Sequence, residues 1–492
     1  MDASANGQRA MLTLLLVTTA AVAGIVIAWS GNTFGERAAY YVAFFGLIGA
    51  GTLVAATRKE PLRFVFLALI AASPIAAALV PPGRLGLTVF DVVMLVLTIA
   101  LIGRWLVSSP ANREPLFPTR SLAIAWTLCV PCVLLSRFPF VSALDFVLIF
   151  AQYAFFLLCL AELRRKGGLE RLVILLSFAA IVMSFGVLID SLWRVNLSLR
   201  GSNLNQLNYG TGIEIYRAGG FFQDPQRCGA FFAVLVTFLL VLAIRGRFAN
   251  AALRAFIWLA IVAGLTALLM TISRSAILSC VVVSALALFA FNAWSWPLKA
   301  AIAATFVLAA TVVAQTSVST WVGLLPDMLQ NRILELPEAL EGRVKIWFDT
   351  WDMFANHPAT GIGLGSFRPY LLETRPGVTD YYGIGAVSGV EYIPDQPENG
   401  YLKILYEGGV VGSMAALLLA GDAVRRALKG TVGASADART ECIAALAALV
   451  TFGVTFMTLF TVGDPRIGAL LAILLAVIWS RSLPHERSTR RT

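Results

Sequence analysis

The sequence predicts an all-α polytopic membrane protein with about 14 transmembrane helices (12–14), cytoplasmic N and C termini, and one large loop on the opposite side. Three observations support this fold class. Of the 492 residues, 58% are hydrophobic and only 13% are charged, whereas a soluble domain is about one quarter charged. Apolar stretches of membrane-spanning length recur along the chain. Basic residues gather in every second gap between these stretches.

The apolar stretches define the expected spans. They cover approximately residues 11–29, 38–57, 62–80, 86–103, 121–136, 142–161, 172–189, 228–244, 255–270, 276–291, 297–315, 400–421, 442–461 and 466–480. A cleavable signal peptide is an alternative for the first stretch, because Arg9 precedes the apolar run. The run continues to Trp29, which suits a span better.

These spans divide the chain into four regions. A transmembrane bundle of about 11 spans occupies residues 1–315 and includes an outside loop near 190–227. A large loop with amphipathic helices follows at 316–399, between the eleventh and twelfth spans. The C-terminal spans occupy 400–480, and a basic tail occupies 481–492.

The distribution of basic residues orients the bundle. Of the 38 Lys and Arg residues, 23 lie in alternate gaps and at the termini, whereas the short gaps on the opposite side hold five. The basic side is therefore expected to be cytoplasmic. This pattern also explains the net charge of +10, so we do not expect nucleic acid as a partner.

The metal-ligand inventory is small. The six cysteines lie in or beside apolar segments, so packing is favoured over redox or metal chemistry, even for Cys129 and Cys132 with their CxxC spacing. Only two histidines are present, which argues against a histidine-built metal site. No metal and no other cofactor is expected.

Two arginine motifs lie close to predicted spans. Arg217 opens the run Arg-Ala-Gly-Gly-Phe, with Arg227 ten residues further on, and Arg274 sits in Thr-Ile-Ser-Arg-Ser between two spans. An arginine at a polar cavity can hold an anion with two parallel hydrogen bonds. The alternatives are an interfacial arginine reaching for lipid headgroups for Arg217, and a solvated hairpin arginine for Arg274.

The large loop contains an amphipathic helix over residues 343–356. Its apolar stripe suits a membrane interface and consists of Val344, Trp347, Trp351 and Phe354. The helix is expected to stop at His357-Pro358, before a turn that contains Gly361, Gly363 and Gly365. No strand precedes these glycines, so dinucleotide binding is rejected.

Glu398 and Asn399 stand at the start of the next span. A carboxylate at this boundary can accept a proton from an alcohol that binds beside it. The alternative is an acidic residue favoured by the positive end of a helix dipole. Both interpretations remain open on spacing alone.

Taken in order, these motifs resemble the bacterial O-antigen ligase and polymerase family. The resemblance covers about residues 215–415. It rests on Arg217-Ala-Gly-Gly-Phe with Pro225, Ser273-Arg274-Ser275, Arg343-Val-Lys-Ile-Trp347, Asn356-His357-Pro358, Gly361-Ile-Gly363-Leu-Gly365, and Glu398-Asn399 followed by Gly409-Val-Val-Gly412.

The resemblance implies a metal-independent glycosyltransferase in the bacterial inner membrane, with its active site facing the periplasm. The donor would be a glycan on undecaprenyl diphosphate, and the acceptor a glycan or glycolipid. Other polysaccharide-assembly proteins and the lipid bilayer would be partners. By this resemblance Arg217, Arg274 and Glu398 are the catalytic candidates, and Arg343, Trp347, Asn399 and Arg227 the substrate-binding candidates. The structural motif comprises His357, Pro358, Gly361, Gly363 and Gly365.

One position departs from the family pattern. Glu398 stands where the ligases carry a histidine that is assigned as the base, and many polymerases lack that histidine. We therefore favour a polysaccharide polymerase, with an O-antigen ligase as the alternative. A transporter or flippase of lipid-linked sugars is a third hypothesis, with Asp91, Asp145 and Glu407 on an ion path. The concentration of polar groups in an outside loop argues against it.

Overall fold

The computed structural model describes most of the chain between residues 60 and 482. The described residues are 60–79, 87–108, 115–194, 197, 206–209, 213–222, 224–245, 248, 250–291, 336–374, 397–431, 435–458 and 462–482.

Apart from one pair of short strands, the regular structure of these residues is helical. The helices are α3 (Pro61–Ala76), α4 (Val89–Val107), α5 (Arg120–Leu134), α6 (Pro139–Leu163), α7 (Gly168–Trp193), α8 (Pro225–Ile244), α9 (Ala251–Met270), α10 (Arg274–Phe291), α14 (Leu336–Asn356), α15 (Phe367–Thr374), α17 (Gly400–Thr431), α18 (Ala436–Phe456) and α19 (Pro465–Ser482). Strands β1 (Gln206–Tyr209) and β2 (Ile213–Tyr216) pair antiparallel, with Gln206 opposite Tyr216.

Each predicted span that falls within the described residues coincides with a helix. Eight of the described helices are long and apolar enough to cross a membrane, and α3, α5 and α10 provide shorter apolar helices. The expected spans at 11–29, 38–57 and 297–315 lie outside the described residues. The protein is thus a multi-pass membrane protein by helix length and composition, while the number of spans and their orientation remain predictions.

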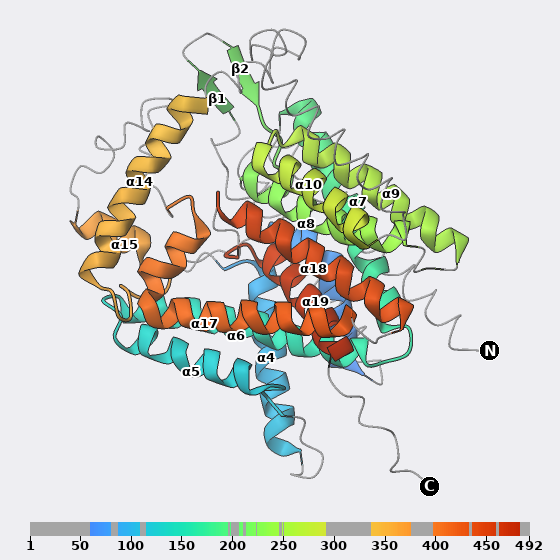
Figure 1. The fold of residues 1–492 in the computed structure, drawn as a ribbon, viewed down its shortest axis with the longest axis horizontal. Helices are drawn as coiled ribbons and strands as arrows, with labels where there is room; N and C mark the ends of the chain where they lie inside the picture. The colour runs from blue at the N-terminus through green and yellow to red at the C-terminus, as the bar shows by residue number, and fades with distance from the viewer. Residues whose placement is uncertain are drawn as a thin grey trace, which may run out of the picture.

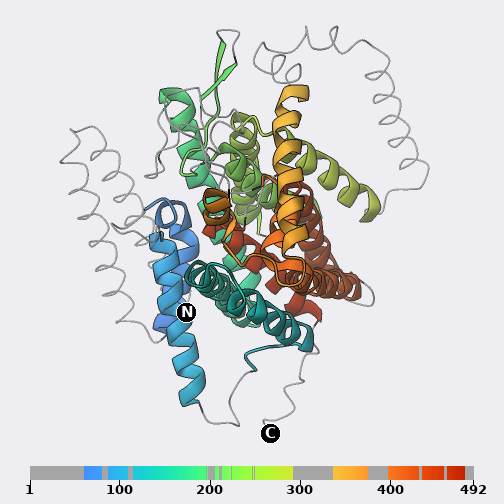
Figure 2. The same ribbon diagram turned by 90° about the vertical axis from the view of Figure 1, so that its left-hand side faces the viewer.

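The helices form a bundle around α8, α18 and α19 (Figure 1). Helix α18 packs against α8, α10 and α17, and α19 packs against α6. Helices α14 and α15 lie at one end of this bundle, at the left in Figure 1, and Figure 2 views the molecule from that end, with the β1–β2 pair at the top of both views. We call this end the loop end.

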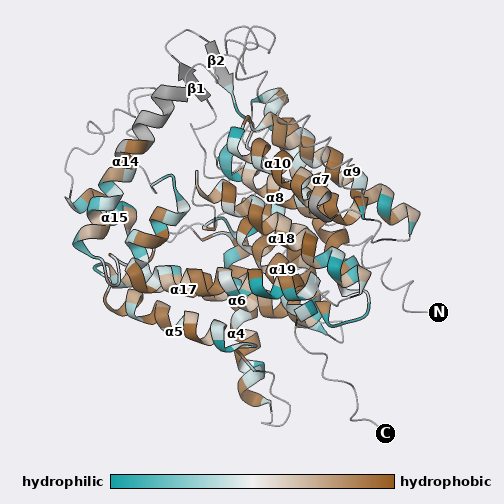
Figure 3. Cartoon of the chain, in the orientation of Figure 1, coloured by the Kyte–Doolittle hydropathy of each residue, from teal (hydrophilic) through white to brown (hydrophobic). Residues whose placement is uncertain are grey.

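The outward faces of the spans are apolar, as Figure 3 shows for α7, α9 and α10. Ile99 and Leu417 are 70% and 71% exposed within helices that have the length of spans. In water such surfaces would favour aggregation. Lipid tails solvate them without that cost, which supports the membrane environment.

Helix α17 is interrupted at Gly409, whose φ and ψ angles (60° and −159°) are not helical. Backbone groups freed inside a membrane protein must find other partners, and here the glycine-containing turn after α14 supplies them. Four hydrogen bonds join the segments, from Ile362 N to Tyr406 O (3.0 Å), Gly363 N to Glu407 O (3.0 Å), Val410 N to Pro358 O (2.8 Å) and Val411 N to Ala359 O (3.1 Å).

The three glycines of this turn are required by its geometry. Gly361, Gly363 and Gly365 have φ angles of 67°, 110° and 67°, a region that side chains with a Cβ rarely adopt. A Cβ on Gly361 would lie 2.4 Å from the backbone carbonyl of Glu407. The turn therefore fits into the break of α17 because it lacks side chains.

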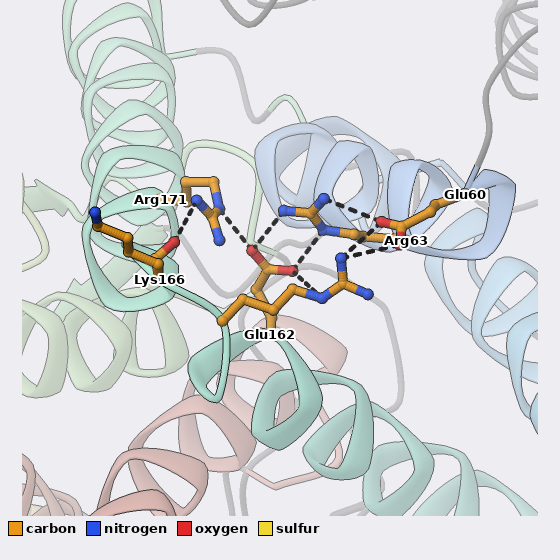
Figure 4. A network of polar contacts seen from close by, with 6 residues as sticks. Glu60, Arg63, Glu162, Lys166 and Arg171 are labelled. Carbon is orange, nitrogen blue, oxygen red and sulfur yellow. Dashed lines mark hydrogen bonds and ion pairs between the residues drawn. The ribbon is translucent and has the colours of Figure 1, made fainter. Parts of the chain in front are cut away.

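A network of arginines and glutamates joins α3, α6 and α7 (Figure 4). Glu162, at the end of α6, is 2% exposed and accepts hydrogen bonds from Arg63 Nε (2.7 Å) on α3 and Arg171 Nε (2.6 Å) on α7. Glu60 binds Arg63 and Arg165 at the same place, and these arginines hold the pKa of Glu60 below its usual value. These residues belong to the gaps that the charge count assigns to the cytoplasm.

Candidate functional site

The loop that carries Arg217 is packed into the bundle. Arg217 is 4% exposed, and its Nε donates to the Thr271 carbonyl oxygen at 3.1 Å. The next residue, Ala218, donates its backbone N–H to Met270 O at 3.3 Å. Arg217 therefore lies against the turn between α9 and α10, and Arg274 is the first residue of α10. The structure brings these two predicted arginine motifs together.

The α9–α10 turn is tight and strained. Thr271 Oγ1 donates to Leu268 O at 2.7 Å, and Ile272 has a φ of 52°, which is unusual for a β-branched residue. Gly229 in the first turns of α8 lies against this turn, since a Cβ there would lie 2.7 Å from Ser273 Cβ. Backbone strain of this kind persists only where the surroundings fix it, often at functional sites.

The buried ion pair between Asp464 and Arg466, at the start of α19, contacts the loop that carries Arg217. Arg466 donates to both carboxylate oxygens of Asp464 at 2.9 and 2.7 Å, and donates to Phe221 O at 2.8 Å. Its guanidinium lies 3.6 Å from the centre of the Phe222 ring. Burial tends to raise the pKa of Asp464, but Arg466 and Arg227 outweigh it and hold that pKa below its usual value. The predicted binding residue Arg227 thus faces this pair.

The Asp464–Arg466 pair was not among the candidates from the sequence. Arg466 is one of the five basic residues in the short gaps opposite the basic side. The signal that could have identified it is Asp-Pro-Arg directly before an apolar stretch, a spacing that suits an N-terminal helix cap with a salt bridge. Its contact with Phe221 could not be found from spacing, because 245 residues separate the partners.

The Glu398 segment begins α17 at the loop end. Glu398 is partly exposed and has a φ of 50°. Asn399 caps the helix, as its Oδ1 accepts from Tyr401 N and Leu402 N at 3.0 and 3.2 Å. A Cβ on Gly400 would lie 2.4 Å from the Phe456 ring. The segment is therefore packed against the last residue of α18.

The same end of α18 also reaches the Arg274 motif. Thr458, just after α18, shares a hydrogen bond of 3.0 Å with Ser275, the neighbour of Arg274. Gly400, close to Glu398, contacts Phe456 in the last turn of α18. The segments that carry Arg217, Arg274 and Glu398 thus meet around the C-terminal end of α18.

Helix α14 packs against α15, the glycine turn and α17 through a face other than its predicted apolar stripe. Ile346 and Met353 pack with Tyr406 of α17 and residues of the glycine turn and α15, while Asp349 and Thr350 are also buried. Of the predicted apolar stripe, Val344 (38%) and Trp351 (53%) are exposed, and Trp347 and Phe354 are partly buried. Contact of this stripe with a membrane interface remains a prediction.

Three predicted residues can be placed on α14 and the glycine turn. Trp347 has a buried indole Nε1 with no hydrogen-bond partner among the described residues. His357 lies with its ring edge-on to Tyr370, with 6.0 Å between ring centres. Pro358 contributes its carbonyl to the α17 break. The side chain of Arg343 lies outside the described residues.

Metal ligands are not gathered at this site in the described part of the chain. There, no three His, Cys, Asp or Glu side chains form a group that could hold a metal ion. The metal-free chemistry expected from the sequence stays a prediction.

Comparison with known families identifies part of the chain. Residues 259–417 match the O-antigen ligase family. The matched segment runs from α9 through Arg274, α14 and the glycine turn to the α17 break, and it confirms the resemblance inferred from the motifs. Arg217 and the Asp464–Arg466 pair lie outside it. No curated protein matches the chain.

Proposed function

We propose that this O-antigen ligase family protein is a glycosyltransferase that polymerises glycan carried on undecaprenyl diphosphate at the periplasmic face of the inner membrane. The acceptor hydroxyl attacks the anomeric carbon, the bond to the diphosphate oxygen breaks, and lipid diphosphate leaves. The meeting of the Arg217, Arg274 and Glu398 segments around the end of α18 is the observation that carries this proposal.

Stabilisation of the leaving diphosphate is assigned to the arginines. Negative charge grows on the leaving oxygen, and preorganised cations in a site with little water lower the energy of that transition state. Arg217 is buried and its Nε is fixed on Thr271 O. Arg274 begins α10, so the partial positive charge of the helix N-terminus adds to its own.

Removal of the acceptor proton is assigned to Glu398. A carboxylate can act as general base if it lies within hydrogen-bonding reach of the hydroxyl. Glu398 is held in a left-handed backbone conformation, with φ of 50°, a conformation that costs a non-glycine residue about 1–2 kcal/mol. The packing of Gly400 against Phe456 supplies a constraint close to it.

We assign glycan binding to the part of α14 that carries Trp347. An indole stacks well on the apolar face of a sugar, and its N–H can donate to a hydroxyl. The buried indole N–H of Trp347, which has no partner among the described residues, suits such a role. Arg343 and Arg227 are proposed as further contacts, and Asn399 as the residue that holds Glu398 at the helix start through its cap.

Ligase activity is the second candidate, because the matching family model is described as O-antigen ligase. Glu398 would then take the role of the ligase histidine, and the acceptor would be lipid A-core or another glycolipid. Purified protein with lipid-linked donor distinguishes the two. Longer lipid-linked glycan without added lipid A-core indicates a polymerase, whereas a heavier lipopolysaccharide that appears only with lipid A-core indicates a ligase.

The site itself is tested by complementation of a deletion strain. We expect Glu398→Gln and Arg274→Ala to abolish the surface glycan that the wild-type gene restores, at equal protein level in the membrane. Arg137→Ala is the matched control, since Arg137 is an exposed arginine at the loop end that pairs with exposed Glu373. Undiminished glycan in both site variants would refute the proposed site.

A further inference from the structure

Asp190 is a buried carboxylate in the last turn of α7 and was not a candidate from the sequence. It is fully buried. Its Oδ2 accepts the backbone N–H groups of Gly219 and Gly220, each at 2.7 Å, and its Oδ1 accepts the hydroxyl of Tyr216. A carboxylate is the side chain best suited to three donors, because its two oxygens only accept.

The three donors surround Arg217 in the sequence. Tyr216 precedes it, and Gly219 and Gly220 follow after Ala218. Asp190 therefore binds the Tyr216 side chain before Arg217 and the backbone after it, and none of these three hydrogen bonds involves the guanidinium. On the other side, Arg217 Nε is held by Thr271 O. The guanidinium is thereby positioned between α7 and the α9–α10 turn.

The packing of the loop on α7 shows how tightly this position is set. Gly220 has a φ of 58°, and a Cβ there would lie 2.8 Å from Val187 N. A Cβ on Gly186 would lie 2.4 Å from the Phe221 ring. Leu197 N also donates to Gly220 O at 3.0 Å. The loop lies directly on the α7 backbone, so a change at Asp190 is transmitted to Arg217.

We propose that Asp190 is a positioning residue for transfer, which holds Arg217 where negative charge develops on the leaving diphosphate. This inference rests on the role proposed for Arg217. In Asp190→Asn one oxygen becomes an NH2 group, which faces either the two glycine N–H groups or the Tyr216 hydroxyl. If the NH2 group faces the glycines, both N–H groups lose their acceptor; if it faces Tyr216, the hydroxyl can accept from it. In the second case all three hydrogen bonds lose the carboxylate charge, and neutral hydrogen bonds are about half as strong as charge-assisted ones. The loop is then held less firmly, and small displacements of a catalytic group are enough to slow a reaction strongly.

The test measures release of lipid diphosphate by purified protein, with donor and acceptor supplied as a lipid extract of the deletion strain. We expect Asp190→Asn to lower kcat about 10- to 100-fold while KM changes less than about threefold, because Arg217 acts in the transition state. Tyr216→Phe removes one of the three donors and should lower kcat about threefold to tenfold. Its melting temperature should stay close to that of the wild type, which keeps the test decisive if Asp190→Asn folds poorly.

A double-mutant cycle separates positioning from general stabilisation. If Asp190 acts through Arg217, the double variant Asp190→Asn/Arg217→Ala should be no slower than Arg217→Ala alone. Asp91→Asn is the matched control, because Asp91 also accepts one backbone N–H (2.8 Å) and one hydroxyl (2.7 Å), both from Thr88. It should lower the melting temperature and leave kcat unchanged.

The outcomes distinguish this inference from the function on which it rests. If Arg217→Ala retains full activity, the proposed role of Arg217 is wrong. If Arg217→Ala is inactive but Asp190→Asn and Tyr216→Phe keep wild-type kcat, the positioning role is wrong and the function stands. Multiplicative losses in the double variant would also overturn the positioning role, because they would show that the two residues act independently.

Discussion

Replacement of Gly361 by alanine should separate the glycine turn from the broken helix α17. Gly361 has a φ of 67°, and an added Cβ would lie 2.4 Å from Glu407 C and O and 2.5 Å from Tyr406 O. These are backbone atoms, which cannot rotate away as the end of a side chain can. The turn must therefore move away from α17.

The size of the effect follows from three contributions. An alanine in the left-handed region costs about 1–2 kcal/mol. Displacement also weakens the hydrogen bonds from Ile362 N and Gly363 N to α17, each contributing about 0.6 kcal/mol in a membrane protein. Gly361→Ala should thus lower the free energy of unfolding by about 3 kcal/mol, before any loss of packing.

Unfolding in mixed detergent micelles measures this change, and limited proteolysis reports the local opening. We expect faster cleavage between residues 357 and 374 in Gly361→Ala than in the wild type. Gly421→Ala in α17 is the matched control, because nothing lies within 4 Å of the added Cβ. An alanine inside a helix should be neutral or stabilise it by up to about 1 kcal/mol.

One outcome would contradict the dependence of the turn on Gly361. If Gly361→Ala unfolds within about 0.5 kcal/mol of Gly421→Ala and is cleaved no faster, the turn does not depend on its glycine. The hydrogen bonds across the α17 break would then contribute little to the attachment of α14 and α15.

Three further predictions address other parts of the molecule. Glu162→Gln should destabilise the protein by about 2 kcal/mol because it leaves several arginines without their shared carboxylate. Glu60→Gln, at the exposed edge of the same network, should lower the free energy of unfolding by less than about 1 kcal/mol. Unfolding of both variants in mixed micelles measures the difference. The lowered pKa of Asp464 means that its ionised form stabilises the fold above the unfolded-state pKa of about 3.9, and that this stabilisation is lost as pH falls through the folded-state value. The stability difference between wild type and Asp464→Asn should therefore be constant from pH 7 to about pH 5 and shrink below about pH 4, and a constant difference at all pH values would contradict the assignment. Trp347→Phe keeps a ring but loses the indole N–H, so we expect KM for the lipid-linked donor to rise about threefold to tenfold, with exposed Trp351→Phe as the control that leaves KM unchanged.

Much of the scaffold could be predicted from local properties of the sequence. Hydropathy over about 20 residues locates a span because the bilayer has a fixed thickness. Glycines and prolines in the 357–365 segment likewise marked a turn after an amphipathic helix, since those residues restrict or free the backbone locally. The order of the motifs also led to the family that residues 259–417 match.

The contacts that build the site could not be predicted in the same way. In the sequence, Asp190 is an acidic residue at the end of a predicted span with no distinguishing motif. Only the structure shows that it accepts the backbone N–H groups of Gly219 and Gly220. Asp464 and Arg466 are two positions apart in the sequence, but the hydrogen bond from Arg466 to Phe221 O joins residues 245 positions apart. Hydropathy and charge report on one segment at a time, whereas these contacts join segments far apart in the chain.

The sequence by itself determined a chain of membrane-spanning helices, a basic side, and the segments in which an arginine, a carboxylate and a glycine turn would matter. Only the tertiary structure decided that the Arg217, Arg274 and Glu398 segments meet at one end of α18, and that the glycine turn completes the hydrogen bonding of a broken helix. The physical reason is that the bilayer acts on each helix separately through its apolar length. The choice of neighbours depends on close packing and on partners for buried polar groups, which are set only when the helices come together.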